Sequence, residues 1–204
     1  MSPRTTVITV TYNRPEWLAE AVASVEEQTD HNWEHLVYDN GSTNPRVDEI
    51  LYAATERAGG RFRYFHAVNN RDIVAPHWNF LLERARGEYV TILDDDNRKR
   101  PDFIERMIAP MEVDLSVDAV SCGWAVIDGS GKPTGEERHL NVATTLERLW
   151  YDNTIDSNAM VFRRSALGRV GLFDASLSTN EDWDFVIRLV RHCRMVHLPD
   201  ALLD

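Results

Sequence analysis

The sequence has 204 residues, of which 43% are hydrophobic and 27% charged, close to the averages of soluble globular proteins. This composition excludes a disordered chain, a collagen-like repeat and a disulfide scaffold. Twenty-two basic and thirty-three acidic residues give a net charge of −11. Nucleic-acid phosphates would repel such a chain unless it carried a strong basic stripe, and the dense basic run at residues 98–100 is too short for one. We therefore expect no nucleic-acid partner.

The sequence also bears on cellular location. No window approaches the ~18 to 20 apolar residues that a membrane span requires, and residues 1–6 lack the basic and apolar segments of a signal peptide. Cys122 and Cys193 form no C-x-x-C pair, so we interpret both as free thiols, which are typical of a reducing compartment. We predict a cytoplasmic protein with no membrane span.

Short apolar runs alternate with amphipathic segments in the first half of the chain. Strands are expected at 7–10, 35–38, 62–66 and 89–93, with helices between them at 17–25, 47–54 and 78–85. Strands that alternate with helices over short connections predict an α/β fold, a mostly parallel sheet flanked by helices on both faces. In such sheets, ligands bind beyond the carboxyl ends of the strands.

The rhythm changes after about residue 113. Strands are expected at 119–127 and 159–162, a hairpin turn at 128–133, and helices at 144–151 and 181–192. No repeat or low-complexity linker divides the chain. We predict a single domain over 1–204, in which residues 1–112 bind a nucleotide and residues 113–204 bind a second substrate.

Three adjacent carboxylates, Asp94, Asp95 and Asp96, directly follow the expected strand 89–93. Neighbouring like charges repel each other unless a cation or hydrogen bonds offset the repulsion. Mg²⁺ and Mn²⁺ prefer oxygen ligands, commonly one or two carboxylates together with substrate phosphates. An isolated acidic run is more often a solvated turn, but its position at the end of an apolar strand favours a cation site. We expect Asp94 and Asp96 to face one side of the turn and Asp95 another.

Asp39 ends the second expected strand. Its carboxylate could cap the following turn, or it could bind a nucleotide base. Because a carboxylate only accepts hydrogen bonds, it would pair with a ring N–H. Uracil and thymine carry one at N3 and guanine carries one at N1, whereas adenine and cytosine have none. The chemistry alone therefore leaves guanine open.

Acidic residues, Glu181, Asp182 and Asp184, open the expected helix 181–192. Capping and the helix dipole favour acidic side chains in a first turn, so their spacing alone favours capping over catalysis.

Other catalytic signatures are absent from the sequence. It has no H-E-x-x-H, G-x-S-x-G, P-loop or G-x-G-x-x-G pattern. These absences argue against a zinc site, a serine hydrolase, a P-loop enzyme and a dinucleotide-binding domain.

Taken together, these motifs resemble the family 2 inverting glycosyltransferases of the GT-A fold. The segments that carry the resemblance are Val10–Arg14, Trp33–Glu34, Tyr38–Ser42, Ala85–Val90, Leu93–Asn97, Pro101–Asp102 and Glu181–Asp182. They span nearly the whole chain in the family's order and spacing. The portion Asp-Asp-Asn-x-x-x-Pro-Asp is similar to the spore-coat polysaccharide glycosyltransferase branch.

The resemblance implies a role for each matching position. It implies a metal-dependent enzyme of polysaccharide biosynthesis that takes a UDP- or dTDP-sugar donor and a hydroxyl acceptor, with Mn²⁺ or Mg²⁺ as the cofactor. Asp95 and Asp96 match the signature that holds the ribose and the metal, and Asp96 is the expected metal ligand. Asp182 matches the family's general base. The expected nucleotide-sugar-binding residues are Thr11, Tyr12, Arg14, Asp39, Asp94 and Asp95.

The sequence departs from the family pattern at Trp78-Asn79, where many members have Arg-Asn, so the phosphate contact of those members is either missing here or supplied by Arg71. Two alternatives stay open. A sugar-nucleotide-binding domain without transfer activity is one, because the sequence ends before a segment in which many members place a further metal or lid residue. A nucleotidyltransferase is the other, although residues 11–16 lack the glycine-rich basic loop usual in those enzymes.

Overall fold

The computed structural model describes residues 2–68, 70, 73–139 and 146–204. Within these ranges, eight strands form one sheet with the order β3-β2-β1-β4-β7-β5-β6, and β8 pairs with β5. The strands are β1 (Thr5–Thr11), β2 (Trp33–Asp39), β3 (Phe62–His66), β4 (Tyr89–Ile92), β5 (Ala119–Ile127), β6 (Pro133–Arg138), β7 (Met160–Arg163) and β8 (Met195–Leu203).

The two halves of the sheet differ in direction. β3, β2, β1 and β4 are parallel neighbours, as the alternation of strands and helices predicted. β7 is antiparallel to both β4 and β5, and β6 is antiparallel to β5, whereas β8 is parallel to β5. Parallel neighbours need a long crossover, while antiparallel ones can follow a tight turn such as the one at 128–132. The sheet is therefore mixed: its parallel part comes from the first half of the chain.

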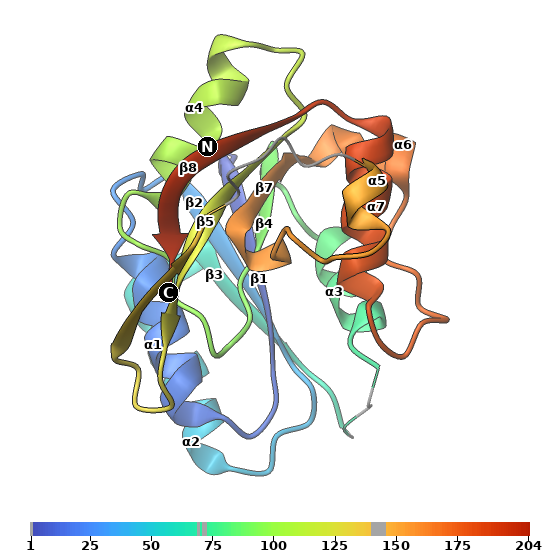
Figure 1. The fold of residues 1–204 in the computed structure, drawn as a ribbon. Helices are drawn as coiled ribbons and strands as arrows, with labels where there is room; N and C mark the ends of the chain where they lie inside the picture. The colour runs from blue at the N-terminus through green and yellow to red at the C-terminus, as the bar shows by residue number, and fades with distance from the viewer. Residues whose placement is uncertain (1, 69, 71–72, 140–145) are drawn as a thin grey trace.

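Helices cover both faces of this sheet (Figure 1). α1 (Pro15–Glu26), α2 (Pro45–Ala58) and α4 (Phe103–Val113) pack on one face. On the other face lie α3 (Ala75–Leu82), α5 (Leu146–Leu149), α6 (Leu167–Val170) and α7 (Glu181–His192). Short 3₁₀ turns are η1 (Gly59–Arg61), η2 (Ser157–Ala159) and η3 (Arg164–Ala166). None of the described helices combines the length and apolar character that crossing a membrane requires.

The strand period of two divides the core between the faces. Val7 packs with side chains of α1 and α4, whereas its neighbour Ile8 packs with side chains of α3 and α7. Both are completely buried. Successive side chains of a strand point to opposite faces, so a continuous apolar run such as 7–10 indicates a strand covered on both sides.

The sequence patterns located most strands and helices but missed three. The expected strands and helices coincide with the observed ones within a few residues, and residues 144–145 of the expected helix 144–151 lie outside the described residues. No element was expected at α4, α6 or β8. β8 contains Pro199, which cannot donate to a sheet ladder. The pairing of β5 with β8 shifts register between Ser121 and Gly123, next to this proline, so the strand accommodates it as an irregularity.

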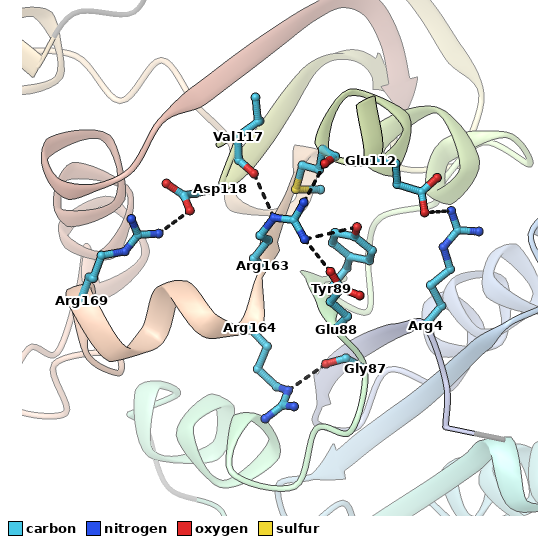
Figure 2. A network of polar contacts seen from close by, with 11 residues as sticks. Arg4, Gly87, Glu88, Tyr89, Glu112, Val117, Asp118, Arg163, Arg164 and Arg169 are labelled. Carbon is cyan, nitrogen blue, oxygen red and sulfur yellow. Dashed lines mark hydrogen bonds and ion pairs between the residues drawn. The ribbon is translucent and has the colours of Figure 1, made fainter. Parts of the chain in front are cut away.

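A network of arginine contacts fixes the start of β4 (Figure 2). Asp94 follows the other end of this strand. Arg163 on β7 donates to the carbonyl oxygens of Val117 at 3.0 Å and Met111 at 2.6 Å, and forms an ion pair with Glu88. Arg164 donates to the Gly87 carbonyl at 2.8 Å. The guanidinium of Arg163 is nearly buried, and these partners compensate its loss of water. These contacts therefore stabilise this end of the sheet.

Gly87 begins the segment that leads into β4. Its amide donates to Thr6 Oγ1 at 2.9 Å, and a Cβ atom here would lie 2.6 Å from the Thr6 amide nitrogen. Any larger residue would push β4 away from β1. Glycine is thus required by the close approach of two backbones.

Candidate functional site

The carboxyl ends of β1, β2 and β4 meet at one edge of the sheet. Thr11 and Asp39, the last residues of β1 and β2, are register partners, and β4 lies on the other side of β1. The turn that follows β4 carries Asp94, Asp95 and Asp96. Parallel strands end at a common edge, so side chains that are distant in sequence come together here.

Asp95 is held in the middle of this edge. It is 4% exposed, its Oδ2 accepts a hydrogen bond from Thr11 Oγ1 at 2.7 Å, and its Oδ1 accepts one from Arg14 at 3.1 Å. Burial raises the pKa of Asp95, and the bonds from Thr11 and Arg14 offset part of that rise. The predicted residues Thr11, Arg14 and Asp95 therefore form one contact group.

Asp96 lies outside this group but shares its arginine. Its exposed carboxylate pairs with Arg14 Nη1 at 3.2 Å, and the Arg14 guanidinium lies 5.3 Å from the centre of the Trp17 ring. Tyr12, the remaining predicted residue of this loop, is 39% exposed. The Arg14 charge and the Asp96 carboxylate are thus both available at the surface of the edge.

Asp94 faces away from the other two carboxylates. Its Oδ2 accepts from the Asn158 side-chain amide at 2.9 Å, and its backbone N–H donates to Asn158 Oδ1 at 2.6 Å. Burial raises the pKa of Asp94 to about 7, against the lowering effect of the Asn158 bond. The expectation that Asp94 and Asp96 face one side was wrong. Residues 95 and 96 form a turn and not an extended strand, so side chains do not alternate there.

Lys99 is a buried residue that contacts Asn158. The lysine is 2% exposed, its Nζ donates to the Asn158 carbonyl oxygen at 2.6 Å, and it lies 3.8 Å from the centre of the Phe103 ring. Burial lowers the pKa of Lys99 to about 7. The sequence indicated Lys99 only as part of the basic run at residues 98–100. Its role in the site could not be found there, because its partner is 59 residues away.

Asp182 lines a small pocket of about 240 Å³ together with Asp94. The other lining residues are Asn97, Trp124, Asn153, Asp156, Ser157 and Asn158. Its neighbours in the first turn of α7 differ: Asp184 is bound to Arg188 at 2.7 Å, and Glu181 is not among the residues that line the pocket. The fold therefore separates the three acidic residues that spacing alone could not.

Asp39 is completely buried at the end of β2. Its Oδ1 accepts from the Ser42 amide at 3.0 Å, and its Oδ2 lies 2.7 Å from Nδ1 of the exposed His66. Within the described residues, Oδ2 accepts no aligned hydrogen bond. A buried carboxylate oxygen without such a bond is costly, so this atom is suited to a donor supplied by a ligand.

The loop between β1 and α1 is held by Asn13, a residue that the sequence interpretation gave no separate role. Asn13 has a positive φ of 54°, and its side-chain oxygen accepts from the amides of Thr43 at 2.8 Å and Asn44 at 3.0 Å. The backbone N–H of Asn13 in turn donates to Ser42 Oγ at 2.9 Å. Asparagine tolerates this left-handed conformation better than most residues. It thereby links the loop of Arg14 to the loop of Asp39.

Within the described part of the chain, two places near this edge of the sheet could contribute oxygen ligands to a metal ion. Among the described residues, Asp39, Asp48 and His66 bring three ligand atoms within 4.8 Å of one another. Asp96 offers a single exposed carboxylate. Mg²⁺ and Mn²⁺ commonly use one or two carboxylates and complete their shell with phosphates and water, so Asp96 fits a cation shared with a diphosphate. The other group includes an imidazole and the buried Asp39.

The departure from the family pattern at Trp78-Asn79 has a structural explanation. Trp78 is buried, with its ring 4.9 Å from that of Phe173. The Asn79 side chain bonds the Phe173 carbonyl and amide, both at 2.9 Å. These two residues therefore tie α3 to the segment before α7. Arg71, the expected replacement, lies outside the described residues.

Comparison with known proteins identifies the family to which the chain is similar. The model of the family "Glycosyl transferase family 2" matches residues 6–171. The chain is 24% identical over 180 residues to a teichuronic acid biosynthesis glycosyltransferase, TuaG of Bacillus subtilis, covering 88% of this chain and 69% of that protein. It is 26% identical over 190 residues to the colanic acid biosynthesis glycosyl transferase WcaA of Escherichia coli, covering 93% and 67%.

Solved structures share the fold. TarS of S. aureus superimposes with a TM-score of 0.79 at 20% identity, covering 98% of this chain and 36% of that one. Shorter TarS structures, of which the chain spans 59%, were solved with UDP, and a mannosyltransferase of Pyrobaculum calidifontis, TM-score 0.70, with GDP-Man and Mn²⁺. The chain thus spans about a third to three fifths of these structures. The family match and the shared GT-A architecture together establish that this chain belongs to glycosyl transferase family 2.

Proposed function

We propose that this glycosyltransferase moves a sugar from a UDP- or dTDP-linked donor to an acceptor hydroxyl, with inversion at the anomeric carbon. The observation that carries the proposal is that Asp94 and Asp182 line the same pocket, beside the turn that bears Asp95 and Asp96. One side of the pocket thus adjoins the residues proposed for the nucleotide, and the other side carries a carboxylate. A direct displacement needs this arrangement, with the donor and the base on opposite sides of the reacting carbon.

The base of the donor nucleotide would bind at Asp39. Its buried Oδ2 can accept the N3–H of uracil or thymine. To do so, the base takes the place that His66 now has beside this oxygen. TarS structures hold UDP and UDP-GlcNAc, which supports a uridine donor, whereas the mannosyltransferase holds GDP-Man. Guanine N1–H could pair with the same oxygen, so GDP-sugars are the competing donors.

The diphosphate would lie between Arg14 and Asp96, with Thr11, Tyr12, Asp94 and Asp95 lining the nucleotide-sugar site. Asp96 would hold the cation, Mn²⁺ or Mg²⁺. A bound cation would neutralise negative charge on the departing diphosphate. Arg14 would stabilise the same charge directly, because its guanidinium can leave Asp96 and donate two parallel N–H bonds to two phosphate oxygens.

Asp182 would act as the general base. It takes the proton of the acceptor hydroxyl while the acceptor oxygen forms its bond to the anomeric carbon. The bond from that carbon to the phosphate oxygen breaks, and the nucleoside diphosphate leaves with the electron pair. Attack from the side opposite the leaving group inverts the anomeric configuration. In this proposal, residues 1–112 hold the donor, and residues 113–204 bring the base and part of the acceptor site.

The proposal is tested by incubation with UDP-sugars and Mn²⁺, followed by product analysis. Transfer is expected to release UDP and to yield a product of inverted configuration. Release of pyrophosphate would indicate a nucleotidyltransferase, and binding without turnover would indicate a sugar-nucleotide-binding domain. A thermal-shift panel of UDP-, dTDP- and GDP-sugars identifies the donor, because a bound ligand stabilises the folded state by mass action.

A further inference from the structure

We propose that the groove between α1 and the β5–β6 hairpin binds an uncharged glycan and presents one of its hydroxyls to Asp182. The inference rests on the proposed function, because it names the class of acceptor for the same site. It starts from the position of the groove, which has a volume of about 920 Å³ and is lined by residues of α1, the hairpin and the turn after Asp96.

The groove adjoins the pocket of Asp94 and Asp182. Asn97, Trp124 and Asp156 line both cavities, so the two are neighbours. Figure 1 shows the hairpin beside α1, at the same end of the molecule as the loops that follow β1 and β2. The volume of the groove is near the upper end of the range of about 300–1,000 Å³ for small-molecule sites. It therefore has room for more than the single sugar that is transferred.

Two tryptophans line the groove. Trp17, on α1, is 43% exposed, and Trp124, on β5, is half-buried. The face of an indole ring carries negative charge density and the C–H groups of a pyranose face carry slight positive charge, so the two surfaces attract each other. Stacking also removes the apolar ring faces from water. Exposed aromatic rings in a groove that is otherwise polar are the arrangement that this contact requires.

The groove has more acidic than basic lining residues. Two arginines line it, Arg98 and Arg138, and Arg98 is already bound to Glu20 at 3.2 Å and to the Gly131 carbonyl at 2.7 Å. Besides Asp96, which would hold the cation, the lining carboxylates are Glu16, Glu20, Asp128, Asp156 and Asp204, of which Glu16 is paired with Arg46 and Asp204 with Arg100. Carboxylates accept strong hydrogen bonds from hydroxyl groups but repel phosphate and uronate groups. Both properties favour an uncharged, hydroxyl-rich chain.

The hairpin wall is pre-organised. At its tip, Asp128 Oδ1 accepts from the amides of Ser130 at 2.8 Å and Lys132 at 3.1 Å. The bond from Arg98 to Gly131 ties this tip to the turn that follows Asp96. A wall that is already ordered loses little conformational entropy when a ligand binds. The groove can therefore bind a flexible oligosaccharide without first having to order the hairpin.

The test compares matched oligosaccharides on the whole chain. Cellotetraose is the uncharged probe, and the same tetramer oxidised to carboxylates at C6 is the anionic one. NMR spectra that resolve the indole N–H signals follow binding, and UDP with Mn²⁺ is titrated into the same samples. Cellotetraose is expected to shift indole signals, and the oxidised tetramer to bind at least about tenfold more weakly because of charge repulsion.

Variants connect the effect to the groove. Trp17→Ala is expected to weaken cellotetraose binding by about tenfold, the loss expected for one stacked ring. Trp124→Ala should have a similar effect if it folds, and Trp17→Ala suffices if it does not. Tyr52→Ala, which removes an exposed aromatic ring of α2 that does not line the groove, should bind as the parent protein does. Because Trp17 contacts Arg14, UDP affinity is recorded for each variant.

The binding results distinguish a failure of the acceptor inference from a failure of the proposed function. A protein that binds UDP but not cellotetraose, that prefers the oxidised tetramer, or that binds cellotetraose equally well as Trp17→Ala would overturn the acceptor inference and leave the proposed function intact. A protein that binds cellotetraose but no nucleoside diphosphate with Mn²⁺ would instead contradict the proposed function.

Discussion

Asp94 and Asn158 are joined by two hydrogen bonds across the junction between the parallel and antiparallel parts of the sheet. The asparagine accepts the Asp94 backbone N–H at 2.6 Å and donates its amide to the Asp94 carboxylate at 2.9 Å. The Asn158 amide also donates to Asp156 Oδ1 at 3.0 Å. Asn158 thus separates two carboxylates at the wall of the pocket and fixes the direction of both.

Asn158→Asp is expected to lower the free energy of unfolding by about 2 kcal/mol, because a buried donor is lost and a third carboxylate is added. Urea denaturation measures this loss. Asn153→Asp is the matched control, since Asn153 lines the same pocket but is exposed, and its effect should stay within about 0.5 kcal/mol. Equal effects of the two substitutions would contradict the role given to Asn158.

Asp39→Asn is expected to weaken UDP binding by about tenfold or more, because the amide would turn its NH₂ group toward the N3–H of the base or lose its bond to Ser42. Calorimetric titration measures the affinities. UDP should bind the parent protein more tightly than ADP or CDP. Equal affinities for UDP and ADP would show that Asp39 does not select the base, and a preference for GDP would identify guanine as the natural one.

Asp96→Asn is expected to abolish the enhancement of UDP binding by Mn²⁺ while the fold is retained. The neutral amide oxygen is a weaker ligand for a hard cation than a carboxylate oxygen. Titration of UDP with and without Mn²⁺ measures this effect. Asp48→Asn is the control, because it disrupts the other group of ligand atoms, Asp39, Asp48 and His66, at an exposed position. If Asp48→Asn removed the dependence on Mn²⁺ and Asp96→Asn did not, the metal would belong to that group.

Asp182→Asn is expected to lower turnover by about 10²- to 10⁴-fold, the usual contribution of a general base. Donor affinity should barely change, because the base contacts the acceptor. Steady-state kinetics and calorimetry separate these two quantities. Glu181→Gln changes the neighbouring acid, which does not line the pocket, and should retain nearly full activity. Asparagine also caps helices well, so near-normal turnover of Asp182→Asn would indicate a cap and not a base.

His35 is expected to make stability depend on pH. Burial, helped by the positive charge of Lys99, lowers the pKa of His35 from 6.5 to about 3. Between pH 6.5 and 3, His35 therefore binds a proton in the unfolded chain but not in the folded chain. The contribution of His35 is complete above pH 6.5 and decreases as the pH falls, by at most about 1.4 kcal/mol per pH unit.

Urea denaturation of the parent protein and His35→Phe between pH 6.5 and 4.5 measures this difference in slope. Thr9→Val is the control, because it removes the hydroxyl that lies 2.9 Å from His35 Nε2 but retains the imidazole. It should destabilise the protein yet keep the steep dependence on pH. Parallel curves for the parent and His35→Phe would contradict the prediction.

The sequence by itself determined the parallel part of the sheet and the residues at its edge. β-branched and apolar runs separated by amphipathic helices predict this architecture, because each strand must be buried on both faces. The turn residues after β1, β2 and β4 then lie at one edge, since parallel strands share a direction. The contact of Thr11 with Asp95 follows from this rule, although the two residues are 84 positions apart.

Only the tertiary structure decided what meets this edge from the second half of the chain. β7 runs antiparallel beside β4 and brings Asn158 to Asp94, and no local pattern encodes the pairing of two strands about 70 residues apart. The same packing gave Lys99 a buried position, separated Asp182 from Glu181 and Asp184, and set Trp17 and Trp124 in one groove. Local propensity acts over a few residues, whereas these contacts depend on which apolar faces are buried together, so they appear only when the chain is folded.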